Sequence, residues 1–240
     1  MKIIAHRGAS GEFPENSLLA FEQAITQGCD GIELDVQYHL ASGKFILLHD
    51  QYLQYNGQRT HYNQLTLTQL LDLPPSKNQN ICTLPEALRT ISKHCFINIE
   101  LKSAAQGSAL LHEIAQLNQL IKKVINEGVI TEEQLILSSF NHHALLPLSA
   151  VLPNASTAAL IACCPINYAE FCQPLKVAQL NLAIDCLNQE IVTDAHKRGL
   201  AVWVYTVDCV DEIEQCLSYG VDGIFTNFPL RSRELLLSIQ

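Results

Sequence analysis

The chain has 240 residues, of which 48% are hydrophobic and only 16% are charged. This composition suits a compact domain with a large core and excludes a disordered chain. The formal net charge of −9 argues against general nucleic-acid binding, which needs a broad basic face, although a local cluster of cations can still bind an anionic substrate.

No stretch is long and apolar enough for a membrane span, and the short apolar run after Lys2 leads directly into His6 and Arg7 rather than into a signal peptide. The nine cysteines are odd in number and contain no C-x-x-C pair, which favours buried, reduced thiols over a zinc site or a disulfide framework. We therefore expect a cytoplasmic protein without stable membrane insertion.

The first elements alternate between strand and helix. Lys2–Ala5 is an apolar strand, residues 15–28 form an amphipathic helix that Asn16 or Ser17 can cap, and Gly31–Val36 is the second strand. A short A-S-G-K turn then leads into a third run, Phe45–His49. So short a turn joins antiparallel neighbours, or two strands that leave and re-enter a sheet.

The segment 51–80 is irregular and rich in Gln, Asn, Tyr and Pro, so we interpret it as an excursion above the main fold, with a short helix near residues 65–73. Thr83–His94 is a helix with a capping box formed by Thr83 and Glu86. Regular alternation follows, with strands at 96–101, 135–140, 157–162, 179–184, 201–207 and 223–226, and with helices at 107–127, 141–152, 167–175, 189–198, 211–219 and 231–239.

This order gives nine short strand runs, of which eight close a barrel if one run is a hairpin partner. Apolar strands separated by amphipathic helices are typical of a parallel sheet covered by helices. The predicted fold class is therefore α/β, a TIM (β/α)8 barrel in one domain over residues 1–240, with a small insertion at about 51–80. An open, doubly wound sheet is the alternative, but no G-x-G-x-x-G follows any strand.

Carboxylates follow the strand pattern at two places. Glu33 and Asp35 lie two residues apart and therefore point to the same side of their strand, whose other residues are apolar. Two buried carboxylates are costly unless a cation pairs with them, and hard cations such as Mg²⁺ and Ca²⁺ prefer oxygen ligands. Glu100 on a later strand adds a third candidate ligand. The alternative for Glu33 and Asp35 is an ordinary acidic strand at the surface.

Titratable and cationic residues also stand at strand ends, where a barrel carries its chemistry. His6 and His49 each follow an apolar run and are candidates for a general acid and base. Lys102, two residues after Glu100, faces a phosphate or carboxylate, or else forms an internal salt bridge with Glu100. A single such histidine is more often structural, but two of them together with Arg7 and the carboxylates favour a catalytic site.

The ordered set H-R-G, P-E-N-S, E-L-D, H-D, E-L-K and G-V-D-G-I-F-T-N-F-P, which spans His6 to Pro229, resembles the glycerophosphodiester phosphodiesterase family. The resemblance implies a TIM barrel with an insertion after the H-D strand. It also implies metal-dependent hydrolysis of a small glycerophosphodiester to glycerol 3-phosphate and an alcohol. By motif position, His6 and His49 would be the acid–base pair, Glu33, Asp35 and Glu100 would bind the metal, and Arg7 and Lys102 would contact the phosphate.

Some positions depart from the family pattern. Tyr205 stands in place of the usual tryptophan of a W-T-V-N motif, Asp208 in place of its asparagine, and Asn227 where an aspartate is common. We interpret these changes as affecting substrate choice and not the acid–base or metal residues. A phosphodiester-binding barrel without turnover and a lyase of the sphingomyelinase D type are the alternative functions. The preferred alcohol, attack by water or through a cyclic phosphate, and the oligomeric state all stay open.

Overall fold

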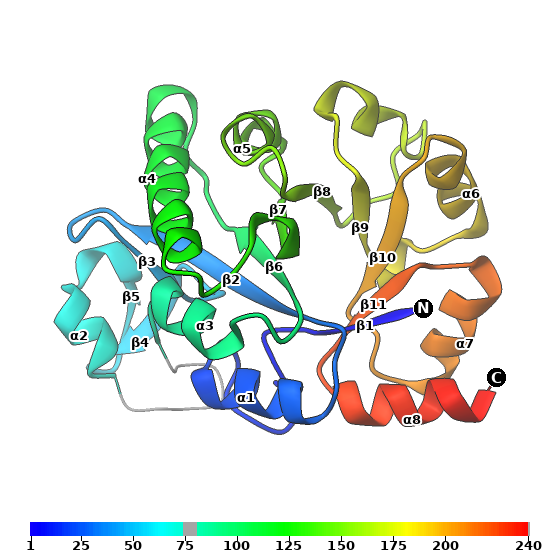
Figure 1. Ribbon diagram of the computed structural model, residues 1–240, viewed down its shortest axis with the longest axis horizontal. Coiled ribbons are helices and arrows are strands. Elements are labelled where there is room, and N and C mark those ends of the chain that lie inside the picture. The colour runs from blue at the N-terminus through cyan, green and yellow to red at the C-terminus, as the bar shows by residue number, and fades with distance from the viewer. Residues whose placement is uncertain (74–80, 240) are drawn as a thin grey trace.

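The computed structural model describes residues 1–73 and 81–239. Its main sheet has nine strands, and the parallel ones close into a barrel because β1 (Lys2–Ala5) pairs with both β2 (Gly31–His39) and β11 (Gly223–Thr226) (Figure 1). The remaining barrel strands are β6 (Phe96–Leu101), β7 (Leu135–Ser139), β8 (Ser156–Ile161), β9 (Gln179–Ala183) and β10 (Ala201–Tyr205). The predicted TIM (β/α)8 barrel is confirmed, and the open sheet is excluded by the closure.

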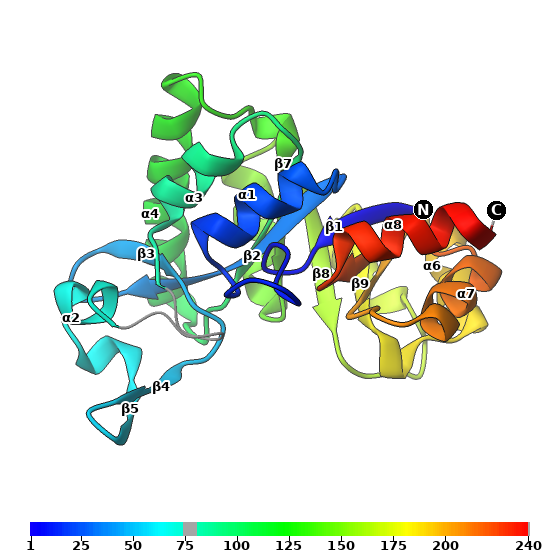
Figure 2. The ribbon, with the colours of Figure 1, turned by 90° about the horizontal axis from the view of Figure 1, so that it is seen from below.

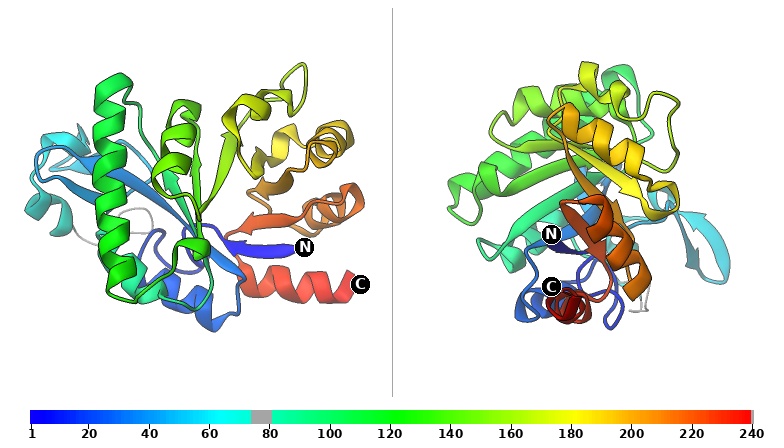
Figure 3. Two further views of the ribbon diagram at one scale, coloured as in Figure 1. Left: turned by 45° about the horizontal axis from the view of Figure 1, so that its top comes forward. Right: turned by 90° about the vertical axis from the view of Figure 1, so that its right-hand side faces the viewer.

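The third run of the sequence is β3 (Lys44–Leu47), which pairs antiparallel with β2, so the A-S-G-K turn joins antiparallel neighbours. After it, β4 (Tyr52–Tyr55) and β5 (Gln58–His61) form a hairpin that projects from the barrel (Figures 2 and 3). The 3₁₀ helix η1 (Tyr62–Gln64) and α2 (Leu67–Leu71) follow. These elements lie within the predicted insertion, whose residues 74–80 fall outside the described part of the chain.

Helices surround the barrel. They are α1 (Leu18–Thr26), α3 (Leu84–Ile91), α4 (Gly107–Asn126), α5 (Leu145–Val151), α6 (Gln189–Lys197), α7 (Val210–Tyr219) and α8 (Pro229–Ile239), with 3₁₀ turns η2 (Glu132–Gln134), η3 (His142–Ala144), η4 (Glu170–Leu175) and η5 (Ile184–Cys186). Helix α1 begins later than predicted because Ser17 Oγ accepts the N–H of Ala20 at 3.1 Å. The helix expected near 167–175 is the 3₁₀ helix η4, which contains Pro174. None of the helices in the described residues is both long and apolar enough to cross a membrane.

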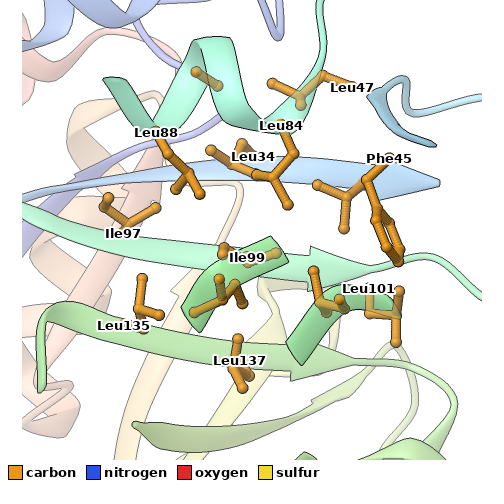
Figure 4. Close-up of a cluster of buried hydrophobic side chains, with 14 of the residues drawn as sticks. Leu34, Phe45, Leu47, Leu84, Leu88, Ile97, Ile99, Leu101, Leu135 and Leu137 are labelled. Carbon is orange, nitrogen blue, oxygen red and sulfur yellow. The ribbon is translucent and has the colours of Figure 1, made fainter. Parts of the chain in front are cut away.

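A large hydrophobic cluster fills the space between the outer face of the barrel and the helices. Figure 4 shows Leu84 and Leu88 of α3 above Leu34 of β2, beside a row of side chains from β6 and β7 (Ile97, Ile99, Leu101, Leu135 and Leu137). Alternate residues of each strand supply this cluster, so the residues between them point into the barrel. On β2 this alternation turns Glu33 and Asp35 inward.

Replacing Leu34 with alanine is expected to lower the free energy of unfolding by about 2–5 kcal/mol, because the fully buried side chain leaves a cavity. Chemical denaturation followed by circular dichroism measures the change. Leu19→Ala is the matched control, because Leu19 on α1 is 45% exposed, and it should cost less than about 1 kcal/mol. Equal losses in the two variants would contradict the assignment of Leu34 to the core.

Below the carboxyl ends of the strands, apolar side chains that include Ile4, Ile136 and Trp203 pack inside the barrel. Gly223 permits this packing, because a Cβ atom there would lie 2.9 Å from the indole nitrogen of Trp203. Buried polar side chains such as Gln179 and Asn181 share this lower interior. The charged side chains lie above them and line a cavity toward the carboxyl ends of the strands.

Candidate active site

A cavity of about 230 Å³ opens at the carboxyl ends of the barrel strands. It is lined by polar residues and by an apolar wall: His6, Arg7, Glu33, His49, Asn98, Glu100, Lys102, Phe140, Leu160, Tyr205, Thr206 and Phe225. Six of the seven residues singled out in the sequence are among them, and the seventh, Asp35, contacts two of these. The structure thus brings all the predicted site residues together.

Three carboxylates form a tight cluster in this cavity. Each of Glu33, Asp35 and Glu100 offers one oxygen that lies within 4.8 Å of the oxygens of the other two. The strand register explains the arrangement, because Asp35 of β2 lies directly opposite Glu100 of β6. Asp35 is 1% exposed and Glu33 is 4% exposed, so the cluster belongs to the interior and is not an acidic surface strand.

Burying three carboxylates so close together costs free energy unless a cation neutralises them. Burial, followed by the charges of Asp35 and Glu100, raises the pKa of Glu33 well above its ordinary value. Burial and Asp35 likewise raise the pKa of Glu100 to about 7. Glu33 Oε1 is buried and has no hydrogen-bond partner among the described residues. A donor set made only of carboxylate oxygens, with one of them unpartnered, fits a hard divalent cation such as Mg²⁺ or Ca²⁺.

Two cations lie against the same carboxylates. Arg7 Nε is 3.0 Å from Asp35 Oδ2, and Lys102 Nζ is 3.5 Å from Asp35 Oδ1. Burial by itself would raise the pKa of Asp35, but Arg7 and Lys102 hold it below the ordinary value. Lys102 Nζ also forms a salt bridge with Glu100 at 3.1 Å, which was the alternative interpretation of this residue, and it lines the cavity as well. Arg7 and Lys102 therefore supply fixed positive charge at the cavity wall.

The turn after β1 positions Arg7. Its φ is +56° and that of Gly8 is +80°, and a Cβ atom on Gly8 would lie 2.7 Å from the backbone of Ala20. The Arg7 backbone N–H donates to Glu33 Oε2 at 2.9 Å, and its guanidinium reaches Glu15 at 3.0 Å. The positive φ of Gly8 and its close contact with Ala20 explain why a glycine follows the arginine in H-R-G.

Sequence reasoning assigned no site role to Glu15 and treated Asn16 only as a possible helix cap. In the structure, Asn16 Nδ2 donates to Asp35 Oδ2 at 3.0 Å, and its Oδ1 accepts the backbone N–H of Asp35 at 3.1 Å. Glu15 holds Arg7. The P-E-N-S motif was the available signal, since two of its residues orient the charged groups of the cavity.

The two histidines occupy different environments. His6 follows β1 and lines the cavity wall. Loss of hydration on burial, followed by the positive charge of Arg7, lowers the pKa of His6 to about 4. It is therefore neutral near pH 7. His49 follows β3 at the rim, with a side chain that is 36% exposed and with Nδ1 at 2.8 Å from Asp50 Oδ1. Gln37 Nε2 donates to the backbone oxygen of His49 at 3.1 Å and supports this position.

Two of the positions that depart from the family pattern lie beside His6. Asn227 Oδ1 is 2.8 Å from His6 Nδ1, and Asn227 Nδ2 donates to Asp208 Oδ2 at 2.5 Å. The interpretation that these changes leave the proposed acid–base residues untouched is therefore wrong. The sequence alone could not predict this contact, because His6 and Asn227 are 221 positions apart and meet only when β1 pairs with β11.

Aromatic side chains form the apolar wall of the cavity. The ring of Tyr205 packs edge-on against Phe140 at 6.1 Å and against Phe225 at 6.5 Å between centroids. Its hydroxyl donates to the backbone oxygen of Ile161 at 2.8 Å. Tyr205 thus presents an apolar face to the cavity, while its hydroxyl is bound to the barrel backbone.

Comparisons with known proteins agree with this architecture. The sequence pattern of the Glycerophosphoryl diester phosphodiesterase family matches residues 6–231. A glycerophosphodiester phosphodiesterase of Caldanaerobacter subterraneus subsp. tengcongensis is 31% identical over 95% of this chain and 94% of its own length. One from Bacillus altitudinis is 30% identical over 96% of both chains.

A solved structure shares the fold closely. The phosphodiesterase OLEI02445 of Oleispira antarctica, in complex with the product sn-glycerol-3-phosphate, superimposes with a TM-score of 0.86. It is 26% identical to this chain, and the match covers 98% of this chain and 96% of that protein. The similarity therefore extends through the whole barrel.

Proposed function

The chain belongs to the glycerophosphoryl diester phosphodiesterase family and is an enzyme of that family, and on this premise we propose that it hydrolyses glycerophosphodiesters to sn-glycerol 3-phosphate and an alcohol. We propose that catalysis depends on a divalent cation and on His6 and His49 as an acid–base pair. The observation that carries this proposal is that both histidines line one cavity with Arg7, Lys102 and the carboxylate cluster.

The phosphate would bind between the cations and the aromatic wall. A phosphodiester is an anion, and charge builds up on its non-bridging oxygens as the P–O bond changes. Arg7 and Lys102 are held in place by Asp35 and therefore need no rearrangement to stabilise that charge. When bound to Glu33, Asp35 and Glu100, Mg²⁺ or Ca²⁺ would add Lewis-acid stabilisation of the same oxygens.

Proton transfer would fall to the histidines. One must accept the proton of the attacking oxygen, and the other must donate a proton to the leaving alkoxide. Their different settings suit a division of labour, since His6 is confined and neutral while His49 is partly exposed beside Asp50. The apolar faces of Phe140 and Tyr205 would exclude water from one side of the phosphate.

The family and the substrate chemistry suggest a small-molecule substrate and no nucleic-acid partner, in keeping with the net charge of −9. We also propose a cytoplasmic location, on the basis of nine unpaired cysteine thiols. We further propose that residues 1–240 form a single catalytic domain, with an insertion at about 51–80.

Release of sn-glycerol 3-phosphate from glycerophosphocholine and glycerophosphoethanolamine tests the function directly. We expect release with Mg²⁺ or Ca²⁺, loss of release with EDTA, and recovery when excess metal is added back. The relative rates with the two substrates rank the alcohols. A folded protein that binds a phosphodiester with metal but yields no product would contradict the proposal and favour a binding module without turnover.

A further inference from the structure

Three side chains from separate parts of the chain form a continuous hydrogen-bonded series beside the cavity. His6 Nδ1 lies 2.8 Å from Asn227 Oδ1, and Asn227 Nδ2 donates to Asp208 Oδ2 at 2.5 Å. The backbone N–H of Asn227 also donates to Asp208 Oδ1 at 2.8 Å. The carboxylate of Asp208 therefore contacts the asparagine twice.

This geometry fixes which end of the Asn227 amide faces His6. An ionised carboxylate only accepts hydrogen bonds, so the NH₂ group of the amide must point to Asp208 and its oxygen must point to His6. Ser10 Oγ lies 2.7 Å from Asn227 Oδ1 and 2.6 Å from the backbone oxygen of His6, so its single proton can serve either acceptor and the orientation rests on Asp208. Asp208 is itself held, since its Oδ1 accepts from Thr226 Oγ1 at 3.0 Å.

An amide oxygen at Nδ1 requires a proton on that nitrogen. In a neutral imidazole the proton then resides on Nδ1, and Nε2 carries the lone pair. The charged groups that act on His6 are Arg7 beside it, Asp35 from β2 and Asp208 after β10. Because Asn227 occupies Nδ1, Nε2 is the nitrogen that His6 can offer to an attacking oxygen in the cavity that it lines.

We propose that Asn227 and Asp208 are positioning residues, which hold His6 in the tautomer protonated at Nδ1 so that it acts as the general base. His6 would take the proton of the attacking oxygen on Nε2, and His49 would donate the proton that the leaving alkoxide needs. This assignment of roles rests on the proposed function, whereas the tautomer itself does not.

Nitrogen NMR of the histidine side chains tests the tautomer without any assay of activity. In protein labelled with ¹⁵N at the imidazole nitrogens, the His6 proton should be on Nδ1 at neutral pH, and comparison with His6→Gln identifies the signal. In Asp208→Asn the amide of Asn227 is no longer held, and a fraction of His6 should carry its proton on Nε2. A wild-type His6 protonated on Nε2 would overturn the proposal.

Exchange of the two side chains provides the kinetic test. Asp208→Asn should lower kcat by about 10-fold and Asn227→Asp by about 100-fold, because the first frees the amide and the second places two carboxylates in contact. The double exchange, D208N with N227D, restores one carboxylate and one amide, so it should recover most of the loss. A carboxylate would then face His6, and the acid limb of the kcat/KM profile should move to higher pH.

A purely structural role for the pair predicts a different pattern, in which the two losses multiply in the double exchange and the acid limb stays in place. That result would overturn the positioning role. Thermal unfolding of each variant separates loss of fold from loss of rate. If the wild-type protein shows no hydrolysis at all, the proposed function fails, while the NMR result still decides the tautomer.

Discussion

Replacing His49 with alanine is expected to lower kcat for glycerophosphodiester hydrolysis by at least about 10²-fold while the protein stays folded. The side chain lies at the cavity rim, beside Asp50, and is 36% exposed. Its removal therefore deletes the proposed proton-transfer group without opening a cavity in the core. KM should change far less than kcat, because Arg7 and Lys102, the proposed phosphate contacts, are unchanged.

The measurement is steady-state release of sn-glycerol 3-phosphate, with circular dichroism as the check on folding. His143→Ala is the matched control, since His143 is exposed on η3 and does not line the cavity. It should keep near-normal turnover. Near-normal turnover of His49→Ala would remove His49 from the mechanism, and an equal loss in both variants would point to a nonspecific effect.

The sequence predicts the barrel and the main residues of its site for a simple physical reason. Residues two apart on a strand share a face, and the carboxyl ends of parallel barrel strands share one rim. Glu33 and Asp35 follow the first rule, and His6 at the end of β1 follows the second. These rules need only local pattern and topology, both of which the chain displays clearly.

Contacts between loops obey no such rule. Asn16 reaches Asp35 through a turn, and Asn227 reaches His6 across the closing pair of strands. Short motifs contained both asparagines, but nothing in their spacing shows which side chain each would meet. The α-helix predicted near 167–175 is wrong for another reason. Pro174 lacks an N–H donor, and the segment forms only a 3₁₀ helix.

Asp35 is the residue on which the charges of the site converge, so its neutralisation is expected to have the largest effect. Its carboxylate contacts Arg7, Lys102 and the Asn16 amide, and it lies opposite Glu100. Asp35→Asn keeps the shape but removes the charge, which leaves two partly buried cations underpaired and removes one of the three proposed metal ligands. We expect the affinity for Mg²⁺ or Ca²⁺ to fall at least about 100-fold and kcat/KM about 10³-fold or more.

Calorimetric titration with the metal and release of sn-glycerol 3-phosphate measure the two effects separately. The matched control is Asp30→Asn, because Asp30 immediately precedes the same strand at the opposite end of the barrel and pairs with Arg233 at 2.8 Å and Lys2 at 3.4 Å. That variant loses two ion pairs yet should keep metal affinity and turnover within about 2-fold of wild type. If Asp35→Asn retained both, the carboxylate cluster would not be the metal site. If Asp30→Asn lost both, the effect would reflect the fold or the net charge rather than the chemistry at the rim.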